Sequence, residues 1–206
     1  MADAERPQIY LISPPEFELS SFPTQLAEVL DAHEVACIRL ALSTRDEDRL
    51  SRAADALREV AHARDVAIVI DSHVGLAERL GLDGVHLTDG ARSVRKVRKT
   101  LGADAIVGAF CATSRHDGMT AAESGADYIS FGPIGATALG DGTVVDPEIF
   151  TWWSEVIEVP VVAEGALNAE NIAELAPVAD FFAIGDEIWA SESSAQALSD
   201  LIAAMS

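Results

Sequence analysis

The sequence predicts a single compact α/β domain over residues 1–206, folded as a (β/α)8 TIM barrel. Three observations lead to this prediction. Eight short apolar segments alternate with eight segments of helical pattern. The apolar segments are mostly uninterrupted, which is typical of parallel strands that are buried on both faces. No linker, low-complexity stretch or second domain divides the chain.

The predicted strands are short runs in which apolar side chains dominate, and many of these side chains are β-branched. The run from Val66 to Ile70 is an example, because Val and Ile pack well in a sheet. The predicted strands cover residues 8–12, 35–40, 66–70, 84–87, 105–109, 127–131, 159–163 and 181–184.

The segments between the strands carry apolar residues at helical spacing, such as Leu26 and Val29 on one face of the first helix. Pro147 stands near a helix start, a position that proline favours. Gly81 and Gly125 stand where a helix should end and the next strand should begin. The predicted helices cover residues 22–33, 45–64, 74–80, 94–101, 115–124, 147–157, 168–175 and 187–205.

An open, doubly wound sheet is the alternative fold for alternating strands and helices. The sequence does not favour it, because no Gly-x-Gly-x-x-Gly motif follows the first strand.

Composition excludes several classes of function. The chain has 14 Lys and Arg against 34 Asp and Glu, a formal net charge of −20. This excess argues against nucleic-acid binding and against docking on anionic membranes. The first residues lack a signal-peptide pattern, and no apolar stretch reaches membrane-spanning length, so we expect a cytoplasmic protein. The expected partner is a small-molecule ligand, and the pair Trp152-Trp153 is compatible with a homo-oligomer contact.

Acidic side chains follow several strands, and in such barrels function lies at the carboxyl ends of the strands. These positions are Asp71, Asp89, Asp141, Glu164, Asp186 and Glu187. Together they predict an acidic pocket for a cation, an amine or a metal. The alternative is that an acidic chain simply places carboxylates at helix starts, where they cap the helix.

Three basic or titratable residues lie in the predicted strands or directly after them. His73 is a candidate acid–base group near the mouth, or a solvated loop residue. His86 lies inside a strand, which favours a hydrogen-bonded place in the core. Arg39 lies near the end of the second strand, and its position predicts either an anion contact or an ion pair with a mouth carboxylate.

Several motifs resemble one family. These are Val69-Ile-Asp-Ser-His-Val-Gly-Leu-Ala77, Leu82-Asp-Gly-Val-His-Leu87, Ile106-Val-Gly108, Gly125-Ala-Asp-Tyr-Ile-Ser-Phe-Gly-Pro133 and Pro160-Val-Val-Ala163. In order and spacing they resemble thiamine phosphate synthases and the related thiazole tautomerases. The resemblance implies a (β/α)8 barrel. It also implies a reaction that joins hydroxymethylpyrimidine diphosphate and thiazole phosphate, with Mg²⁺, to give thiamine phosphate and pyrophosphate.

The residues that bind Mg²⁺ and diphosphate in this family are largely replaced. Ser72 and Ala91 stand where the resemblance places the two Mg²⁺ carboxylates, so no cofactor is predicted with certainty. Arg39 is kept from a diphosphate-binding Arg-x-Lys, but Ala41 replaces the lysine. Of a Thr-x-Thr-Lys segment only Thr137 remains.

The phosphate-binding loops of the family also differ here. The resemblance places phosphate on backbone N–H groups of a Gly-Gly after strand seven and a Ser-Ala after strand eight. This chain has Gly165-Ala166, preceded by Glu164, and Asp186-Glu187. The candidate substrate-binding residues are therefore Arg39, Asp71, His73, Asp89, Thr137, Glu164, Gly165 and Asp186.

The substitutions argue against efficient catalysis of the parent reaction, so three functions stay open. The first is a thiamine phosphate synthase-like transferase. The second is a catalytically silent barrel that binds a small molecule. The third is a barrel enzyme that uses an acidic pocket on a non-phosphorylated or cationic substrate.

Overall fold

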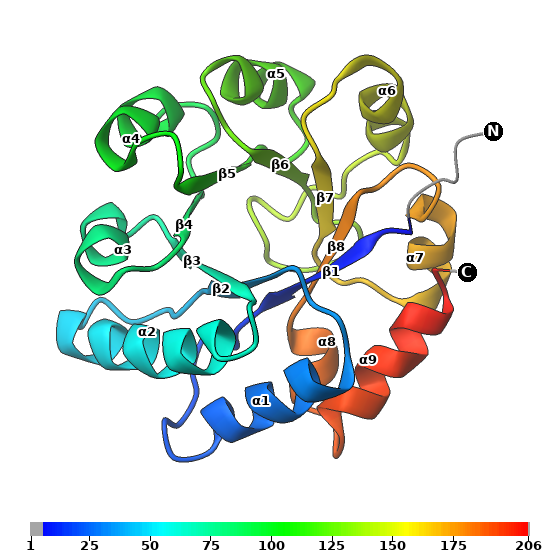
Figure 1. Cartoon of the computed structure of the whole chain (residues 1–206). Coiled ribbons are helices and arrows are strands. Elements are labelled where there is room, and N and C mark those ends of the chain that lie inside the picture. The colour runs from blue at the N-terminus through cyan, green and yellow to red at the C-terminus, as the bar shows by residue number, and fades with distance from the viewer. Residues whose placement is uncertain (1–5, 206) are drawn as a thin grey trace.

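The computed structural model describes residues 6–205, which form a closed barrel of eight parallel strands (Figure 1). Each strand pairs with its neighbours in the sequence, and β1 pairs with β8 to close the ring. The strands are β1 Gln8–Ile12, β2 Cys37–Leu40, β3 Ala67–Asp71, β4 Gly84–Leu87, β5 Ile106–Phe110, β6 Tyr128–Phe131, β7 Val161–Glu164 and β8 Phe181–Ile184. The predicted (β/α)8 fold is confirmed, and the open-sheet alternative is wrong.

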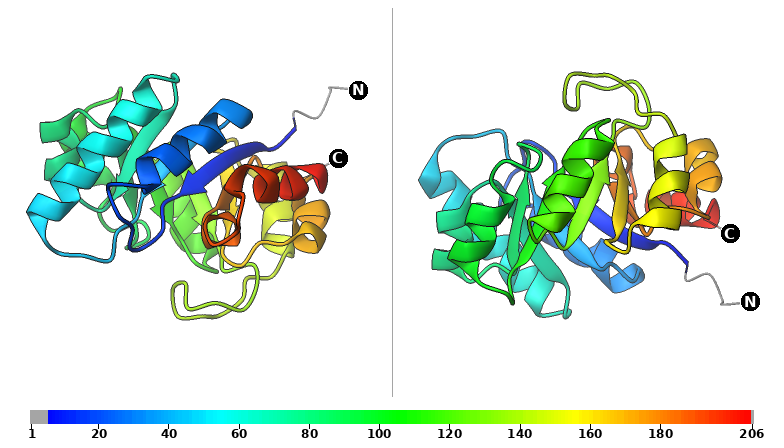
Figure 2. Two further views of the ribbon diagram at one scale, coloured as in Figure 1. Left: turned by 90° about the horizontal axis from the view of Figure 1, so that it is seen from below. Right: turned by 90° about the horizontal axis from the view of Figure 1, so that it is seen from above.

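Helices surround the strands and form the outer layer (Figures 1 and 2). They are α1 Phe22–Ala32, α2 Glu47–His62, α3 Val74–Leu80, α4 Val94–Leu101, α5 Arg115–Glu123, α6 Glu148–Val156, α7 Ala169–Leu175, α8 Asp186–Trp189 and α9 Ser194–Ala203. Residues 1–5 and residue 206 lie outside the described residues. Residues 1–5 belong to the N-terminal segment that lacks a signal-peptide pattern.

The single helix predicted over residues 187–205 is wrong. The structure has two helices there, α8 and α9, separated by residues 190–193. Ser193 caps α9, because its side chain accepts a hydrogen bond from the backbone N–H of Gln196. Serine side chains that bind the backbone in this way favour a helix start over a helix interior.

Local sequence sets the other helix ends. Asn168 and Asn171 form a reciprocal capping box at the start of α7, which satisfies two N–H groups that the helix leaves free. Gly81 ends α3 with φ of +66°, in the left-handed region that glycine adopts without strain. This glycine therefore turns the chain directly into β4, as its position in the sequence predicts.

The strands are buried on both faces, so the barrel has two packing regions. Between strands and helices, Trp153 is fully buried and packs on Phe131 at a ring-centroid distance of 5.1 Å. Trp152 is half-buried and lies 5.0 Å from the Arg115 guanidinium. Inside the barrel, a second cluster contains Tyr10, Cys37, Val69, Tyr128, Val162 and Ala183. Each of these six residues comes from a different strand, so the cluster spans the inside of the ring.

Tyr128 fits inside the barrel because the neighbouring strand offers a glycine. A Cβ atom built on Gly108 would lie 2.0 Å from Cζ of Tyr128, far closer than two carbon atoms can approach. Since β5 pairs with β6 at Gly108 and Tyr128, the tyrosine ring occupies the space that a side chain at Gly108 would fill.

The longest connection runs from β6 to α6 and covers residues 132–147. It projects away from the barrel (Figure 2) and brings Thr137 and Leu139 to a cavity at the carboxyl ends of the strands.

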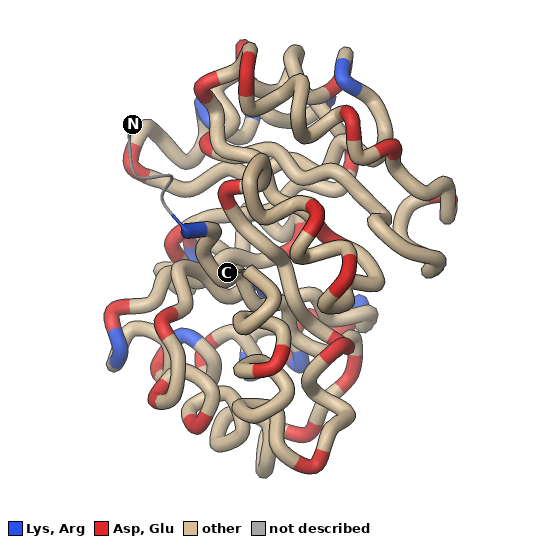
Figure 3. The backbone as a smooth tube through the Cα atoms, turned by 90° about the vertical axis from the view of Figure 1, so that its right-hand side faces the viewer, with Lys and Arg blue, Asp and Glu red and all other residues tan. Residues whose placement is uncertain are grey.

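Acidic residues are spread over the outer helices and loops, and they outnumber the basic ones (Figure 3). Among the described residues, no helix is both long enough and apolar enough to cross a membrane.

Candidate functional site at the mouth of the barrel

A cavity of about 420 Å³, here called the mouth cavity, opens at the carboxyl ends of β1, β2, β7 and β8. Its volume lies within the range typical of small-molecule sites. The lining residues are Ile12, Ser13, Pro15, Arg39, Ala41, Ala136, Thr137, Leu139, Glu164, Gly165, Ala166, Ala183, Gly185, Asp186 and Glu187. Its position is the one at which (β/α)8 barrels carry their active sites.

A buried ion pair forms the floor of the mouth cavity. Arg39 Nη2 donates a hydrogen bond to Glu164 Oε2 at 2.7 Å, and Ser130 Oγ donates to Glu164 Oε1 at 2.7 Å. Arg39 is only 5% exposed and Glu164 only 1%. Burial alone would lower the pKa of Arg39, but Glu164 and Asp71 outweigh it and raise this pKa well above its ordinary value. Arg39 is therefore a charged group, held in place by its carboxylate partner.

Asp71 lies beside this pair at the end of β3. Its Oδ1 is 3.4 Å from Arg39 Nε, and among the described residues neither atom has a hydrogen-bond partner. Burial raises the pKa of Asp71 to about 6, Arg39 opposes this rise, and Glu164 adds to it. One cation thus faces two carboxyl groups, so the cluster is negative when Asp71 is ionised.

A chain of uncharged polar groups continues from the floor into the barrel. His86 Nε2 lies 4.0 Å from Glu164 Oε1, and His86 Nδ1 is hydrogen-bonded to the Tyr128 hydroxyl at 2.8 Å. The Tyr128 and Tyr10 hydroxyls are 2.7 Å apart. Burial, and then Arg39, lowers the pKa of His86 well below its usual value, so His86 is neutral. The core role predicted for His86 is confirmed.

Glu187 closes one side of the mouth cavity. Its Oε1 accepts a hydrogen bond from the Leu167 backbone N–H at 3.0 Å, and its Oε2 accepts one from the Gly185 N–H at 2.7 Å. One carboxylate therefore bridges the loop after β7 and the start of α8.

The structure brings together six of the eight predicted site residues. Five line the mouth cavity: Arg39, Thr137, Glu164, Gly165 and Asp186. The sixth, Asp71, reaches Arg39 from β3. The ion pair predicted between Arg39 and a mouth carboxylate is therefore present.

His73 and Asp89 do not line the mouth cavity, and a part for them in substrate binding stays a prediction. His73 precedes α3 and makes no side-chain cap there. Asp89 is exposed and accepts a hydrogen bond from Ser93 Oγ at 2.5 Å. Both residues lie beyond the last residue of their strand, where side-chain direction is no longer fixed by the sheet.

The residues at the expected magnesium positions do not fit the ion. Ser72 and Ala91 offer no carboxylate, and the nearby Asp71 faces Arg39. Among the described residues, no group of three or more His, Cys, Asp or Glu side chains is arranged to hold a metal. Mg²⁺ prefers carboxylate and phosphate oxygens, so this chain supplies little of its usual protein coordination.

Sequence reasoning missed Ser130, Tyr10 and the hydrogen bonds of Glu187. Ser130 and Tyr128 are two residues apart in β6, and this alternation is the signal that places both inside the barrel. The sequence held no signal for the pairing of Ser130 with Glu164, which lie 34 residues apart.

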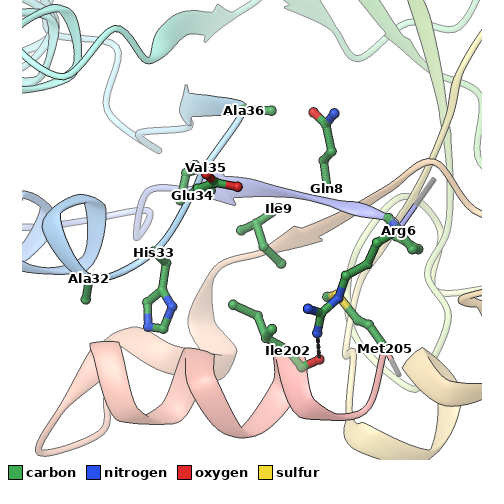
Figure 4. Close-up of a pocket in the computed structure, with 11 residues that line it drawn as sticks. Arg6, Gln8, Ile9, Ala32, His33, Glu34, Val35, Ala36, Ile202 and Met205 are labelled. Carbon is green, nitrogen blue, oxygen red and sulfur yellow. Dashed lines mark hydrogen bonds between the residues drawn. The ribbon is translucent and has the colours of Figure 1, made fainter.

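A larger cavity of about 590 Å³, here called the N-terminal groove, lies at the other end of β1 between the ends of α1 and α9 (Figure 4). Arg6 Nη2 donates a hydrogen bond to the Ile202 carbonyl at 2.8 Å across it. Arg6 and Glu34 are exposed and His33 is half-buried, so the groove holds no buried charge of the kind seen at the mouth.

Comparison with known proteins supports the resemblance seen in the sequence. A sequence model of a family described as thiamine monophosphate synthase matches residues 9–188. The chain is 43% identical over 184 residues to the thiamine-phosphate synthase of Rhodospirillum centenum, covering 88% of this chain and 89% of that protein. It is 38% identical over 213 residues to the thiamine-phosphate synthase of Erythrobacter litoralis, covering 99% and 100% of the two chains.

Solved structures share the fold. Thiamine phosphate pyrophosphorylase from Pyrococcus furiosus superposes with a TM-score of 0.83 over 96% of this chain and 95% of that one, at 23% identity. The geranylgeranylglyceryl phosphate synthase of Thermoplasma acidophilum, solved with sn-glycerol-1-phosphate, gives a TM-score of 0.72 over 97% and 93% at 18% identity. At these identities the likeness concerns the barrel alone.

Proposed function

Because this chain belongs to the thiamine monophosphate synthase family, we propose that it joins the pyrimidine and thiazole precursors of thiamine phosphate in the mouth cavity. The observation that supports this most is the mouth cavity itself, which gathers the family-matched Arg39, Thr137 and Gly165 at the end of the barrel where such enzymes act. Two relatives named thiamine-phosphate synthase, at 43% and 38% identity, support the same substrates.

In this proposal the chain's own residues mainly bind and orient the precursors. Arg39 lines the cavity as a fixed cation, and it attracts the side of a ligand on which negative charge lies. Ala41, Ala136 and Leu139 offer apolar surface against which a heterocyclic ring can pack. Glu164 keeps Arg39 oriented, so we expect both residues of the pair to be needed for binding.

No step of the reaction is assigned to Mg²⁺, because the residues at the positions expected for the Mg²⁺ ligands do not fit the ion. A Mg²⁺ titration is therefore part of the test. Should the metal arrive bound to the diphosphate of the substrate, activity will need Mg²⁺ even though the protein supplies few ligands.

The test is an incubation of the purified chain with hydroxymethylpyrimidine diphosphate, thiazole phosphate and Mg²⁺, with thiamine phosphate measured by chromatography. We expect product above a blank without protein, and a loss of product in Arg39→Met. No product from the folded wild-type chain would falsify the proposal.

A second function is favoured by the charge of the floor, where Arg39 is already paired and Asp71 adds a further carboxyl group. It is the binding of a non-phosphorylated or cationic heterocycle, without joining of the precursors. Thermal unfolding with the unphosphorylated aminopyrimidine alcohol, with simple amines and with divalent metals tests it, because a ligand of the folded state raises the midpoint. No shift with any of these compounds rules it out.

A further inference from the structure

Three Asp residues have the same role at the end of the barrel opposite the mouth cavity. Asp83, Asp127 and Asp180 directly precede β4, β6 and β8. One carboxylate oxygen of each accepts a hydrogen bond from a backbone N–H of the preceding strand, at Ile68 (2.7 Å), Val107 (2.7 Å) and Val161 (2.8 Å) respectively. The backbone N–H of each Asp donates to the carbonyl of that same strand residue. A carboxylate therefore completes the pairing at the start of three strand pairs.

The first strand pair, β1 with β2, lacks this carboxylate. Ala36 lies opposite Ile9, in the place that Asp83 has opposite Ile68. The Ala36 N–H still donates to the Ile9 carbonyl at 2.9 Å. Within a strand, the N–H and the carbonyl of one residue point to the same neighbour, so the Ile9 N–H is also directed toward β2 and the segment before it. Among the residues that the structure describes, no atom accepts a hydrogen bond from it.

The open N–H coincides with the N-terminal groove. Ile9, Val35 and Ala36 all line this cavity of about 590 Å³. Ile9 is only 4% exposed, and a buried donor without an acceptor is unfavourable until an oxygen atom reaches it. Apolar surface from Ile9, Ile202 and Met205 surrounds the groove (Figure 4). The groove therefore combines one buried hydrogen-bond donor with apolar walls.

The surroundings of the three Asp residues show which charge suits such a place. His62 Nε2 lies 2.8 Å from Asp83, and Arg98 forms an ion pair with Asp127. At the groove the nearby basic residue is Arg6, which lies across the cavity. The Asp residues follow the ends of α3, α5 and α7, as Ala36 follows the end of α1, so the negative end of a helix does not exclude a carboxylate there. Glu34, exposed in the groove, is the charge that opposes one.

We propose that the N-terminal groove binds a small carboxylic acid with an apolar body. The carboxylate of this ligand accepts the hydrogen bond of the Ile9 N–H and so takes the part that Asp83, Asp127 and Asp180 have in the other strand pairs. The apolar body packs on Ile9, Ile202 and Met205. This site lies in a different cavity from that of the proposed reaction and is independent of it.

The experiment titrates the full chain with benzoate and follows backbone amide resonances by NMR. Benzyl alcohol is the matched probe, since it has the same ring without the charge. We expect benzoate to bind in the millimolar range typical of so small a ligand and to move the Ile9 amide resonance. Benzyl alcohol should bind about fivefold or more weakly, because its hydrogen bond to the N–H is not assisted by charge.

Ala36→Asp supplies the missing carboxylate from within the chain. It should weaken benzoate binding about tenfold or more, because the Ile9 N–H is then occupied and a like charge faces the ligand. It should also raise the midpoint of thermal unfolding by about 2–4 °C, the effect of one added hydrogen bond in a chain of this size. Ala36→Leu is the control for added volume and should bring no such rise. Glu34→Gln should tighten benzoate binding by up to about threefold, since it removes an exposed opposing charge.

An Ile9 amide resonance that benzoate does not move overturns the inference, and so does equal binding of benzoate and benzyl alcohol. Unchanged benzoate affinity in the folded Ala36→Asp variant overturns it as well. If that variant does not fold, Ala36→Asn replaces it, because its amide oxygen also accepts the Ile9 N–H, and an unchanged affinity counts in the same way.

Discussion

The two ends of the barrel differ in what their cavities are made of. The N-terminal groove is the larger, about 590 Å³ against about 420 Å³ at the mouth. Its charged residues Arg6 and Glu34 are exposed, whereas Arg39 and Glu164 at the mouth are 5% and 1% exposed. Charge removed from water is unfavourable for folding unless it is paired. The difference teaches that buried charge, more than cavity volume, distinguishes the end that holds the candidate site.

The polarity of the buried side chains decreases step by step along the barrel axis, from the mouth toward the other end. Charged Arg39 and Glu164 lie at the mouth, neutral His86 follows, and the Tyr128 and Tyr10 hydroxyls come next. Below the tyrosines lies a small cavity of about 160 Å³ with mainly apolar walls. The polar chain thus ends inside the barrel.

The largest effect is expected from breaking the buried ion pair. Glu164→Ala removes the hydrogen-bonded carboxylate of the buried Arg39 guanidinium and leaves only Asp71 at 3.4 Å, which should lower the free energy of unfolding by up to about 3–5 kcal/mol. Arg6→Ala, at the exposed groove, should cost no more than about 1 kcal/mol. Urea unfolding measures both values.

The double variant Arg39→Met/Glu164→Leu is the control for this comparison. It removes both charges and fills similar volume, so it should be more stable than Glu164→Ala. Equal losses in Glu164→Ala and Arg6→Ala would mean that buried charge does not distinguish the two ends.

The next effect tests the middle of the barrel. Tyr128→Phe removes the hydroxyl that joins His86 to Tyr10 and leaves both groups without this partner, at a cost of about 1–3 kcal/mol. Tyr10→Phe removes only the end of the chain and should cost less. If Tyr10→Phe proves the more harmful in urea unfolding, the hydrogen-bonded chain is not organised around Tyr128.

A third prediction concerns ligand binding at the two cavities. Ala41→Phe should fill the mouth cavity and weaken binding of thiazole phosphate about tenfold or more, which is about 1.4 kcal/mol. Ala32→Phe, in the N-terminal groove, should leave this affinity unchanged. Calorimetric titration of the two folded variants decides, and the opposite pattern would place the ligand in the groove.

The last comparison concerns a pH dependence of stability. The pKa of Asp71 is raised mainly by burial to about 6, above the value of about 4 in an unfolded chain. The folded chain therefore binds this proton more tightly, and Asp71 stabilises the fold fully below about pH 4. This contribution is lost as the pH rises through 6.

Asp71→Asn should remove this dependence, so the stability difference between wild type and variant should change between about pH 4 and pH 6. Glu34→Gln, an exposed carboxylate at the N-terminal groove, is the matched control. A constant difference for Asp71→Asn across this range contradicts the prediction.

Much of the fold follows from patterns within the sequence. Uninterrupted apolar runs predict parallel strands, and Gly81 marks a true helix end. The predicted seventh strand begins two residues early, at Val159. The Val159 carbonyl instead accepts a hydrogen bond from Trp153 Nε1, and Pro160 has no N–H to donate, so β7 starts at Val161.

The site was less predictable, because its contacts join residues far apart in the sequence. The strand ends correctly indicate that Arg39 and Glu164 reach the mouth, but their 2.7 Å contact spans 125 residues. Asp89 has the same type of position in the sequence, yet its side chain binds Ser93 outside the cavity. The position of a residue along a strand predicts the face of the sheet on which its side chain lies. The hydrogen-bond partner of that side chain depends on how the whole barrel closes.

The space that Gly108 leaves for Tyr128 also limits how this sequence can diverge. A methyl group at position 108 would collide with the Tyr128 ring, so the two positions are not free to change one at a time. An alanine at 108 is compatible with this barrel only where a smaller residue replaces the tyrosine, and His86 then loses its hydroxyl partner. Among relatives, a larger residue at 108 should therefore occur together with a non-aromatic residue at 128.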